Sequence, residues 1–182
     1  MNVFDYLDSN EKNLSDDKKK LFIKETAEHF LGGVRHFPDG LETMMNHEIK
    51  RRQLLFFLYG AIDCALADFG REKIFGDNDT EAMAKENNLI WDYFQENLGY
   101  RIEEVLDILI VCSDSRSPND NEILGYDRNQ ILNLVTYGGQ SFLDSIKQVR
   151  EWVKISENKE EEDYYKNSGS HGQLLALLHE DY

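Results

Sequence analysis

LLFFLYGAIDCALADF, residues 54–69, is the most apolar stretch of this chain, and it decides the fold class. A membrane-spanning helix needs about 20 apolar residues, whereas this run has 16 residues and contains Asp63 and Asp68. A strand is disfavoured because the run is too long and because Gly60 and the alanines have low strand propensity. The stretch therefore predicts a helix that is apolar on nearly all sides and is buried at the centre of a helical protein.

The central helix is expected to cover about residues 40–70. Asp39 can cap its N-terminus with Glu42 three residues later, and Gly70 can end it. In this arrangement the basic turn HEIKRR, 47–52, forms the exposed early part of the helix, and 54–69 forms the buried part. The small residues of the buried part allow neighbouring helices to approach closely.

Helical patterns also cover most of the remaining chain. Apolar spacing, caps and glycines predict helices over 15–31 with an end or kink at Gly32-Gly33, over 80–98, over 102–112, over 127–137 with a break at Gly138-Gly139, and over 141–155. Met83, Ile90, Phe94 and Leu98 are expected to form the buried side of helix 80–98. Because no convincing strand pair appears, the prediction is an all-α, single-domain irregular bundle of about six to seven helices.

The chain divides into three parts by composition. Residues 1–155 are predicted to be the helical domain, and 156–170 to be a polar loop or linker. Residues 171–182 carry the apolar run LLALL, which predicts a short helix docked on the same domain.

Composition places the protein among globular cytoplasmic proteins. It has 182 residues, of which 41% are hydrophobic and 30% charged, which suits one domain with a real core. The two cysteines, Cys64 and Cys112, each lie in an apolar run, as buried free thiols in a reducing compartment do. The first 13 residues lack the basic and apolar regions of a signal peptide. We therefore expect a cytoplasmic protein without a membrane anchor.

Negative charge is concentrated in one third of the sequence. The formal net charge is −15, which argues against direct binding to nucleic-acid phosphates. Residues 77–127 contain 13 acidic and three basic residues, a net charge of −10. Such a region suits fast, electrostatically steered association with a basic protein, and the alternative is a solvated acidic surface. The candidate partner-binding residues are Trp91, Asp92, Glu96, Glu103, Glu104, Asp107, Asp120 and Glu122.

Two other kinds of site were considered. Asp63, within the buried helix, is either a catalytic carboxylate or the structural partner of an Arg, a Tyr hydroxyl or a helix N-terminus. Glu25 and His29 lie one helical turn apart, and together with His47 they are the alternative candidate for a metal site. No second Glu/His motif, phosphate-binding glycine loop or nucleophile elbow occurs. We therefore predict no cofactor, no metal and no catalytic residue.

The interpretation that follows is a protein-binding helical domain, which is favoured over an enzyme. Its most specific version is an immunity protein or antitoxin that inhibits a basic, nucleic-acid-cleaving toxin by placing carboxylates where phosphates bind. The alternative is a small helical-bundle enzyme or metal-binding protein that uses Glu, His and Asp side chains.

Overall fold

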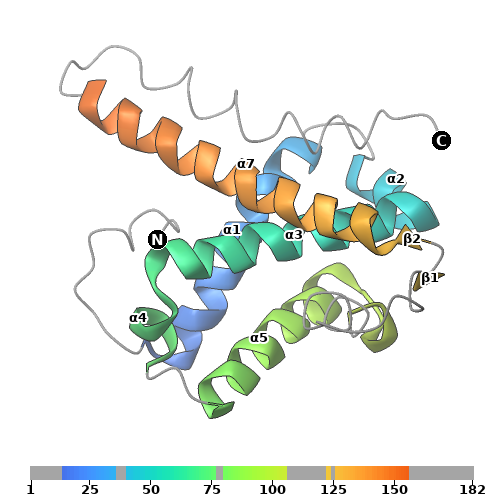
Figure 1. Cartoon of the computed structure of the whole chain (residues 1–182), viewed down its shortest axis with the longest axis horizontal. Helices are drawn as coiled ribbons and strands as arrows, with labels where there is room; N and C mark the ends of the chain where they lie inside the picture. Colours follow the sequence, from blue (N-terminus) through green and yellow to red (C-terminus); the bar gives the residue numbers. More distant parts are fainter. Residues whose placement is uncertain (1–13, 36–39, 77–79, 106–121, 124–125, 156–182) are drawn as a thin grey trace.

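Residues 54–69 form the buried helix that their composition predicts, as the larger part of α3 (Glu48–Phe69). In the computed structural model of the chain, five consecutive side chains, Leu54 to Leu58, are at most 1% exposed. Only a helix surrounded on several sides can bury consecutive residues, because successive side chains point in different directions. α3 is accordingly the central element of the fold (Figure 1).

Helices surround α3, so the predicted all-α class is confirmed. The structure describes residues 14–35, 40–76, 80–105, 122–123 and 126–155. Around α3 lie α1 (Asp16–Arg35), α2 (Gly40–Asn46), α4 (Arg71–Phe75), α5 (Thr80–Leu98) and α7 (Arg128–Ile155). Residues 102–105 are also helical. One antiparallel pair of two-residue strands, β1 (Glu122–Ile123) and β2 (Tyr126–Asp127), precedes α7, although no strand pair was predicted.

The predicted helix 40–70 is wrong in one respect, because it is divided into α2 and α3 at His47. His47 has an extended backbone (φ −101°, ψ 116°), and its Nδ1 accepts a long hydrogen bond of 3.5 Å from the backbone N–H of Lys50. An extended residue with such a bond is an N-cap and cannot lie inside a helix. The predicted end at Gly70 is confirmed, since Gly70 has φ 85° and its N–H bonds to the carbonyl of Ala67.

The predicted break at Gly138-Gly139 is also wrong, and so is the prediction that α1 ends at Gly32-Gly33. α7 continues through Gly138-Gly139, and α1 continues through Gly32-Gly33 to Arg35. A glycine in a helix costs only about 1 kcal/mol relative to alanine, and burial outweighs that cost here. Phe30, Leu31 and Val34, around the first pair, are fully buried.

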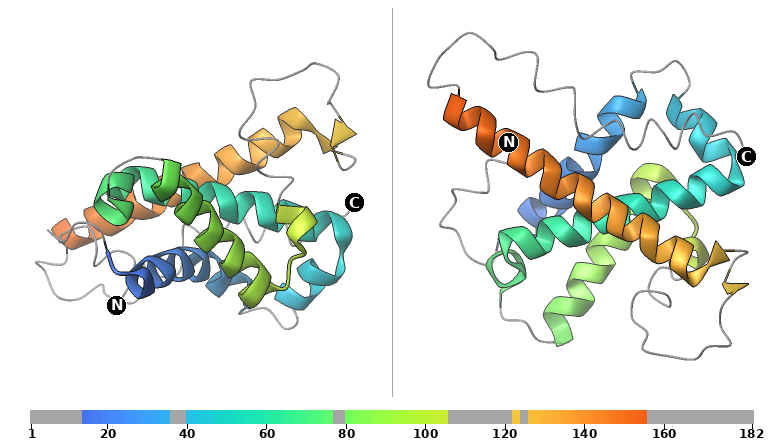
Figure 2. Two further views of the ribbon diagram at one scale, coloured as in Figure 1. Left: turned by 90° about the horizontal axis from the view of Figure 1, so that it is seen from below. Right: turned by 45° about the horizontal axis from the view of Figure 1, so that its top comes forward.

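The second glycine pair explains how α7 and α3 pack. α7 crosses α3 (Figure 2), and the two backbones are nearly in contact there. A Cβ atom on Gly138 would lie 1.9 Å from the carbonyl oxygen of Phe57, and one on Gly60 would lie 1.9 Å from that of Val135. The expectation that small residues let a neighbouring helix approach α3 is therefore confirmed, with glycines on both helices.

α5 has the predicted bounds and, with one exception, the predicted core side. Leu89, Ile90, Phe94 and Leu98 are buried, but Met83 is 56% exposed, so its predicted burial is wrong. The predicted linker 156–170 and short helix 171–182 lie outside the described residues, and so does most of the predicted helix 102–112.

Candidate partner-binding face

α5 separates its side chains into a core side and an outer side. The outer side carries Ala84, Asn88, Asp92 and Glu96, which are spaced by four residues and are all exposed. This spacing keeps them on one stripe of the helix. Within the described part of the chain, neither Asp92 nor Glu96 has an ion-pair partner. We use the name acidic face for Asp92 and Glu96 on this stripe together with Glu103, which is exposed in the turn that follows α5.

The other predicted contact residues have different positions. Trp91 is partly buried and packs against the hydrophobic core, at the border of the acidic face. Glu104 is only 6% exposed, so it is not part of the face. The backbone of Glu122 lies in β1, and Asp107 and Asp120 are outside the described residues.

Polar contacts also join α5 to α1. Lys85 Nζ lies 2.7 Å from Asp16 Oδ1, and the Tyr93 hydroxyl donates a 3.2 Å hydrogen bond to Glu28 Oε1. Burial, together with the nearby carboxylate of Glu28, raises the pKa of Tyr93 far above its usual value. Tyr93 therefore stays protonated as a donor, and these contacts fix α5 against rotation about its own axis.

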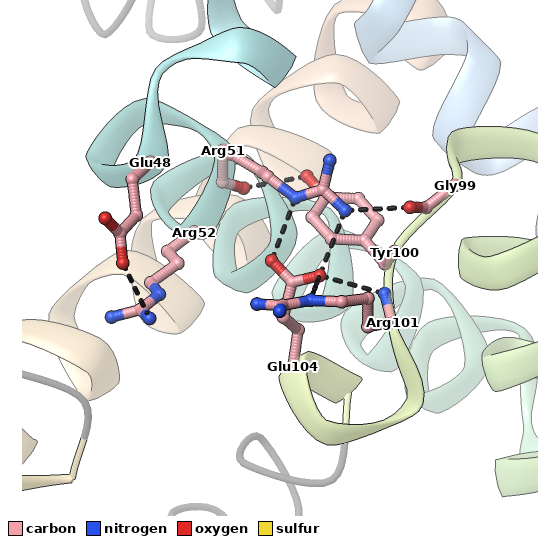
Figure 3. A network of polar contacts seen from close by, with 7 residues as sticks. All are labelled: Glu48, Arg51, Arg52, Gly99, Tyr100, Arg101 and Glu104. Atoms are coloured by element: carbon pink, nitrogen blue, oxygen red, sulfur yellow. Dashed lines mark hydrogen bonds and ion pairs between the residues drawn. The ribbon is translucent and has the colours of Figure 1, made fainter.

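A second set of contacts attaches the turn after α5 to α3 (Figure 3). Arg51 binds Glu104 through two parallel hydrogen bonds, Nε to Oε1 at 2.8 Å and Nη2 to Oε2 at 2.9 Å. Its Nη2 also donates to the Gly99 carbonyl at 2.7 Å, while the Tyr100 hydroxyl donates to the Arg51 carbonyl at 2.7 Å. The backbone N–H of Arg101 completes the set with a 2.8 Å bond to Glu104 Oε2. Such bidentate charge-assisted pairs are geometrically specific, so the turn has one defined position.

The electrostatics of Glu104 follow from these bonds. Burial alone would raise the pKa of Glu104, but the hydrogen bonds from Arg51 and from the Arg101 backbone lower it below its ordinary value. The carboxylate is thus held in its charged form by its donors. The guanidinium of Arg51 also lies over the Tyr100 ring, with Cζ 4.7 Å from the ring centroid. The ring therefore covers one face of the guanidinium that binds Glu104.

The prediction that the turn 47–52 is exposed is confirmed for residues 47–49 but is wrong for its two arginines. The side chains of Arg51 and Arg52 are 21% and 17% exposed, and Arg52 pairs with Glu48 at 3.0 Å. Sequence reasoning missed Arg51 because its partner, Glu104, lies 53 residues later. The only available signal was an arginine two residues before a buried run.

Asp63 pairs with an arginine, as its interpretation as a structural carboxylate predicts. Arg71 donates to the carboxylate and, at 3.3 Å, to the backbone carbonyl of Asp63, and its Nε donates to Glu86 at 3.2 Å. Burial and the nearby Asp63 charge raise the pKa of Glu86, while Arg71 opposes the rise. Arg71 thus connects α3, α4 and α5. The Asp63 side chain is 46% exposed, so Asp63 is not the deeply buried acid that its neighbours in sequence suggest.

The alternative metal-site candidates do not come together. Glu25 and His29 lie on α1, and His47 is the N-cap of α3. Among the described residues, no group of three or more His, Cys, Asp or Glu side chains could hold a metal ion. Cys64 is a half-buried free thiol, and burial followed by the nearby Asp68 and Asp63 raises its pKa, which is the opposite of an activated nucleophile.

Comparison with known proteins adds no relative. No protein-family model, curated protein or solved structure matches the chain. A membrane-spanning helix is not found in the described segments either, because none of their helices reaches the length and hydropathy that crossing a bilayer demands.

Proposed function

We propose that this protein binds a basic protein in the cytoplasm through the acidic face, Asp92, Glu96 and Glu103. In its most specific form the proposal is an immunity protein or antitoxin whose partner is a nucleic-acid-cleaving toxin. The observation that carries it is the outer side of α5. Two carboxylates lie there one turn apart without a described counter-ion, on a helix that ion pairs join to α1 and α4.

The contrast with the other acidic residues of the region supports this proposal. Glu86 and Glu104 are bound by Arg71 and Arg51, so their charges are largely compensated inside the protein. Asp92 and Glu96 are not compensated in this way and contribute fully to the external field. Uncompensated surface charge of one sign raises the association rate with an oppositely charged partner, and it makes that rate dependent on ionic strength.

The fixed position of the face contributes to affinity. Binding orders mobile side chains and segments, and that ordering weakens association. Here α5 and the turn after it are already attached to α1, α3 and α4. A rigid helix also holds its carboxylates at a constant spacing. Carboxylates that occupy the binding positions of successive phosphates on a toxin need such a spacing. Trp91, at the border, can add an aromatic contact.

The test is the charge reversal Asp92→Lys/Glu96→Lys, measured against the basic nuclease that a pull-down with the unaltered protein recovers from native lysate; recovery of no basic protein would refute the proposal. We expect association to slow by about tenfold or more at low salt, because electrostatic steering changes rates by that order. The salt dependence of the association rate should become flatter, and inhibition of the nuclease should weaken. Stopped-flow fluorescence and a nuclease assay give these quantities.

The matched control is Glu42→Lys/Glu72→Lys, which changes the net charge equally at exposed positions on α2 and α4. Circular dichroism should show both variants folded, since exposed substitutions usually change stability by less than about 0.5 kcal/mol. Equal effects of the two double variants would reduce the acidic face to ordinary solvated surface. No inhibition by the unaltered protein would refute the toxin-inhibitor form.

A further inference from the structure

The outer side of α7 has no described neighbour that accounts for its apolar residues. α7 packs mainly against α3, which covers the side that contains Phe142 and Ile146. On the outer side Tyr137 is 54% and Leu143 is 40% exposed, with Gln140 between them. These two are among only five large apolar side chains that are exposed in the described part of the chain.

One segment of the same chain has complementary properties. Residues 171–182 contain four leucines, Leu174, Leu175, Leu177 and Leu178, within five positions. In a helix, Leu174, Leu175 and Leu178 fall on one side. Such an apolar run is favoured to leave water by packing on another apolar surface.

Charge favours the same pairing. α7 has four basic and two acidic residues, a net charge of +2, and it is the most basic helix that the structure describes. Residues 156–182 have seven acidic and two basic residues, a net charge of −5. Lys147, exposed on α7, lies one turn after Leu143, and Glu180 and Asp181 follow the leucine run after His179.

The connection is also long enough. Leu143 precedes the end of α7 at Ile155 by 12 residues, which is about 18 Å along a helix. The 15 residues 156–170 can span at most about 50 Å. They can therefore return the leucine run to any position between Tyr137 and Lys147. We propose that the leucine run 174–178 docks on the outer side of α7, over Tyr137 and Leu143, and covers this surface within one molecule.

This inference is independent of the acidic face on α5 and is tested on the full chain. A nitroxide spin label is attached at Gln173→Cys in a Cys64→Ala/Cys112→Ala background, and NMR amide intensities are compared before and after the label is reduced. We expect at least a twofold intensity loss for amides between residues 136 and 147. The same labelled chain with Leu174→Asp/Leu178→Asp should recover those intensities, and so should the chain with Leu143→Asp.

Two results would overturn the inference. Intensity losses that miss α7, or that persist in the Asp variants, would show that the leucine run does not occupy this surface. A mixed sample of isotope-labelled protein and unlabelled, spin-labelled protein separates contacts within a molecule from contacts between molecules. Losses on α7 in the mixed sample would assign its outer side to a second copy of the chain.

Discussion

Glu103 and Glu104 are adjacent acidic residues with opposite roles. Glu103 is exposed on the acidic face, whereas Glu104 is bound by Arg51 and by the backbone N–H of Arg101. The difference arises because neighbouring side chains on a helical turn point about 100° apart. One position therefore faces solvent, and the next faces α3.

The two residues should respond differently to loss of charge. Glu104→Gln should lower the free energy of unfolding at pH 7 by about 1–2 kcal/mol, because hydrogen bonds to charged groups contribute about 1.5–3 kcal/mol and the partly exposed Arg51 reduces that figure. Glu103→Gln should change it by less than about 0.5 kcal/mol. Urea unfolding of both variants measures the difference.

Measuring the stability of the unaltered protein and of Glu104→Gln at low pH tests whether the charge of Glu104 causes the difference. The folded-state pKa of Glu104 is lowered from its ordinary value near 4.5, so the unfolded chain takes up this proton first as the pH falls. The stabilisation is complete above the unfolded-state pKa, and it is lost as the pH falls through the folded-state pKa. The gap between the unaltered protein and Glu104→Gln should therefore shrink below about pH 4.5. A gap of equal size at pH 7 and pH 3.5 would contradict a role for the ion pair.

At the scale of elements, the crossing of α3 and α7 is the most constrained feature. Gly60 and Gly138 lie where each helix contacts the backbone of the other. The two backbones can approach this closely only because glycine has no side chain. The glycines of α7 therefore allow α7 to pack on α3, and they do not end a helix.

Substitution by alanine should affect the stability of the protein differently at the two glycines of α7. In an isolated helix Gly→Ala stabilises by about 1 kcal/mol. Gly138→Ala, however, would place Cβ 1.9 Å from a backbone oxygen that cannot move away locally. We expect the variant to lose about 1–3 kcal/mol or more, the range for overpacked cores. Thermal and urea unfolding measure this loss.

Gly139→Ala is the matched control, because its Cβ would lie 3.3 Å from the Cys64 side chain rather than 1.9 Å from backbone. Gly139→Ala should lower the free energy of unfolding by distinctly less than Gly138→Ala does. If Gly138→Ala were as stable as the unaltered protein, α3 and α7 would not pack as closely as the structure describes.

At the scale of the whole molecule, one hydrophobic core joins α1, α3, α5 and α7. α5 reaches the core beside α1, and α7 reaches it across α3. Because these helices share one core, neither α5 nor α7 has an independent set of apolar contacts with which to unfold separately.

The two tryptophans, Trp91 in α5 and Trp152 in α7, can test this unity. Trp91→Phe leaves a reporter on α7, and Trp152→Phe leaves one on α5. We expect each variant's fluorescence transition in urea to coincide with its own circular dichroism transition, as in two-state unfolding. Separate midpoints for the two methods in either variant would show that the helices unfold independently.

Local pattern was sufficient for much of the fold. The apolar run 54–69 predicted the buried centre, and the bounds of α5 and the end of α3 at Gly70 followed from caps and glycines. The candidate face was predicted in part, because Asp92 and Glu96 are exposed on one stripe, as their four-residue spacing indicates. These features depend on residues within a few turns of one another.

What the sequence by itself determined, then, is the all-α class, the buried helix and the acidic stripe, since helical periodicity and composition act locally. The tertiary structure alone decided that Gly138 packs a helix instead of ending it, that Arg51 turns inward, and that Glu104 leaves the acidic face while Glu103 remains on it. Each of these outcomes depends on a partner far away in the chain, Phe57 for Gly138 and Arg51 for Glu104. Hydrogen bonds and steric contacts act over a few ångströms in space, and sequence spacing does not reveal which distant residues come that close.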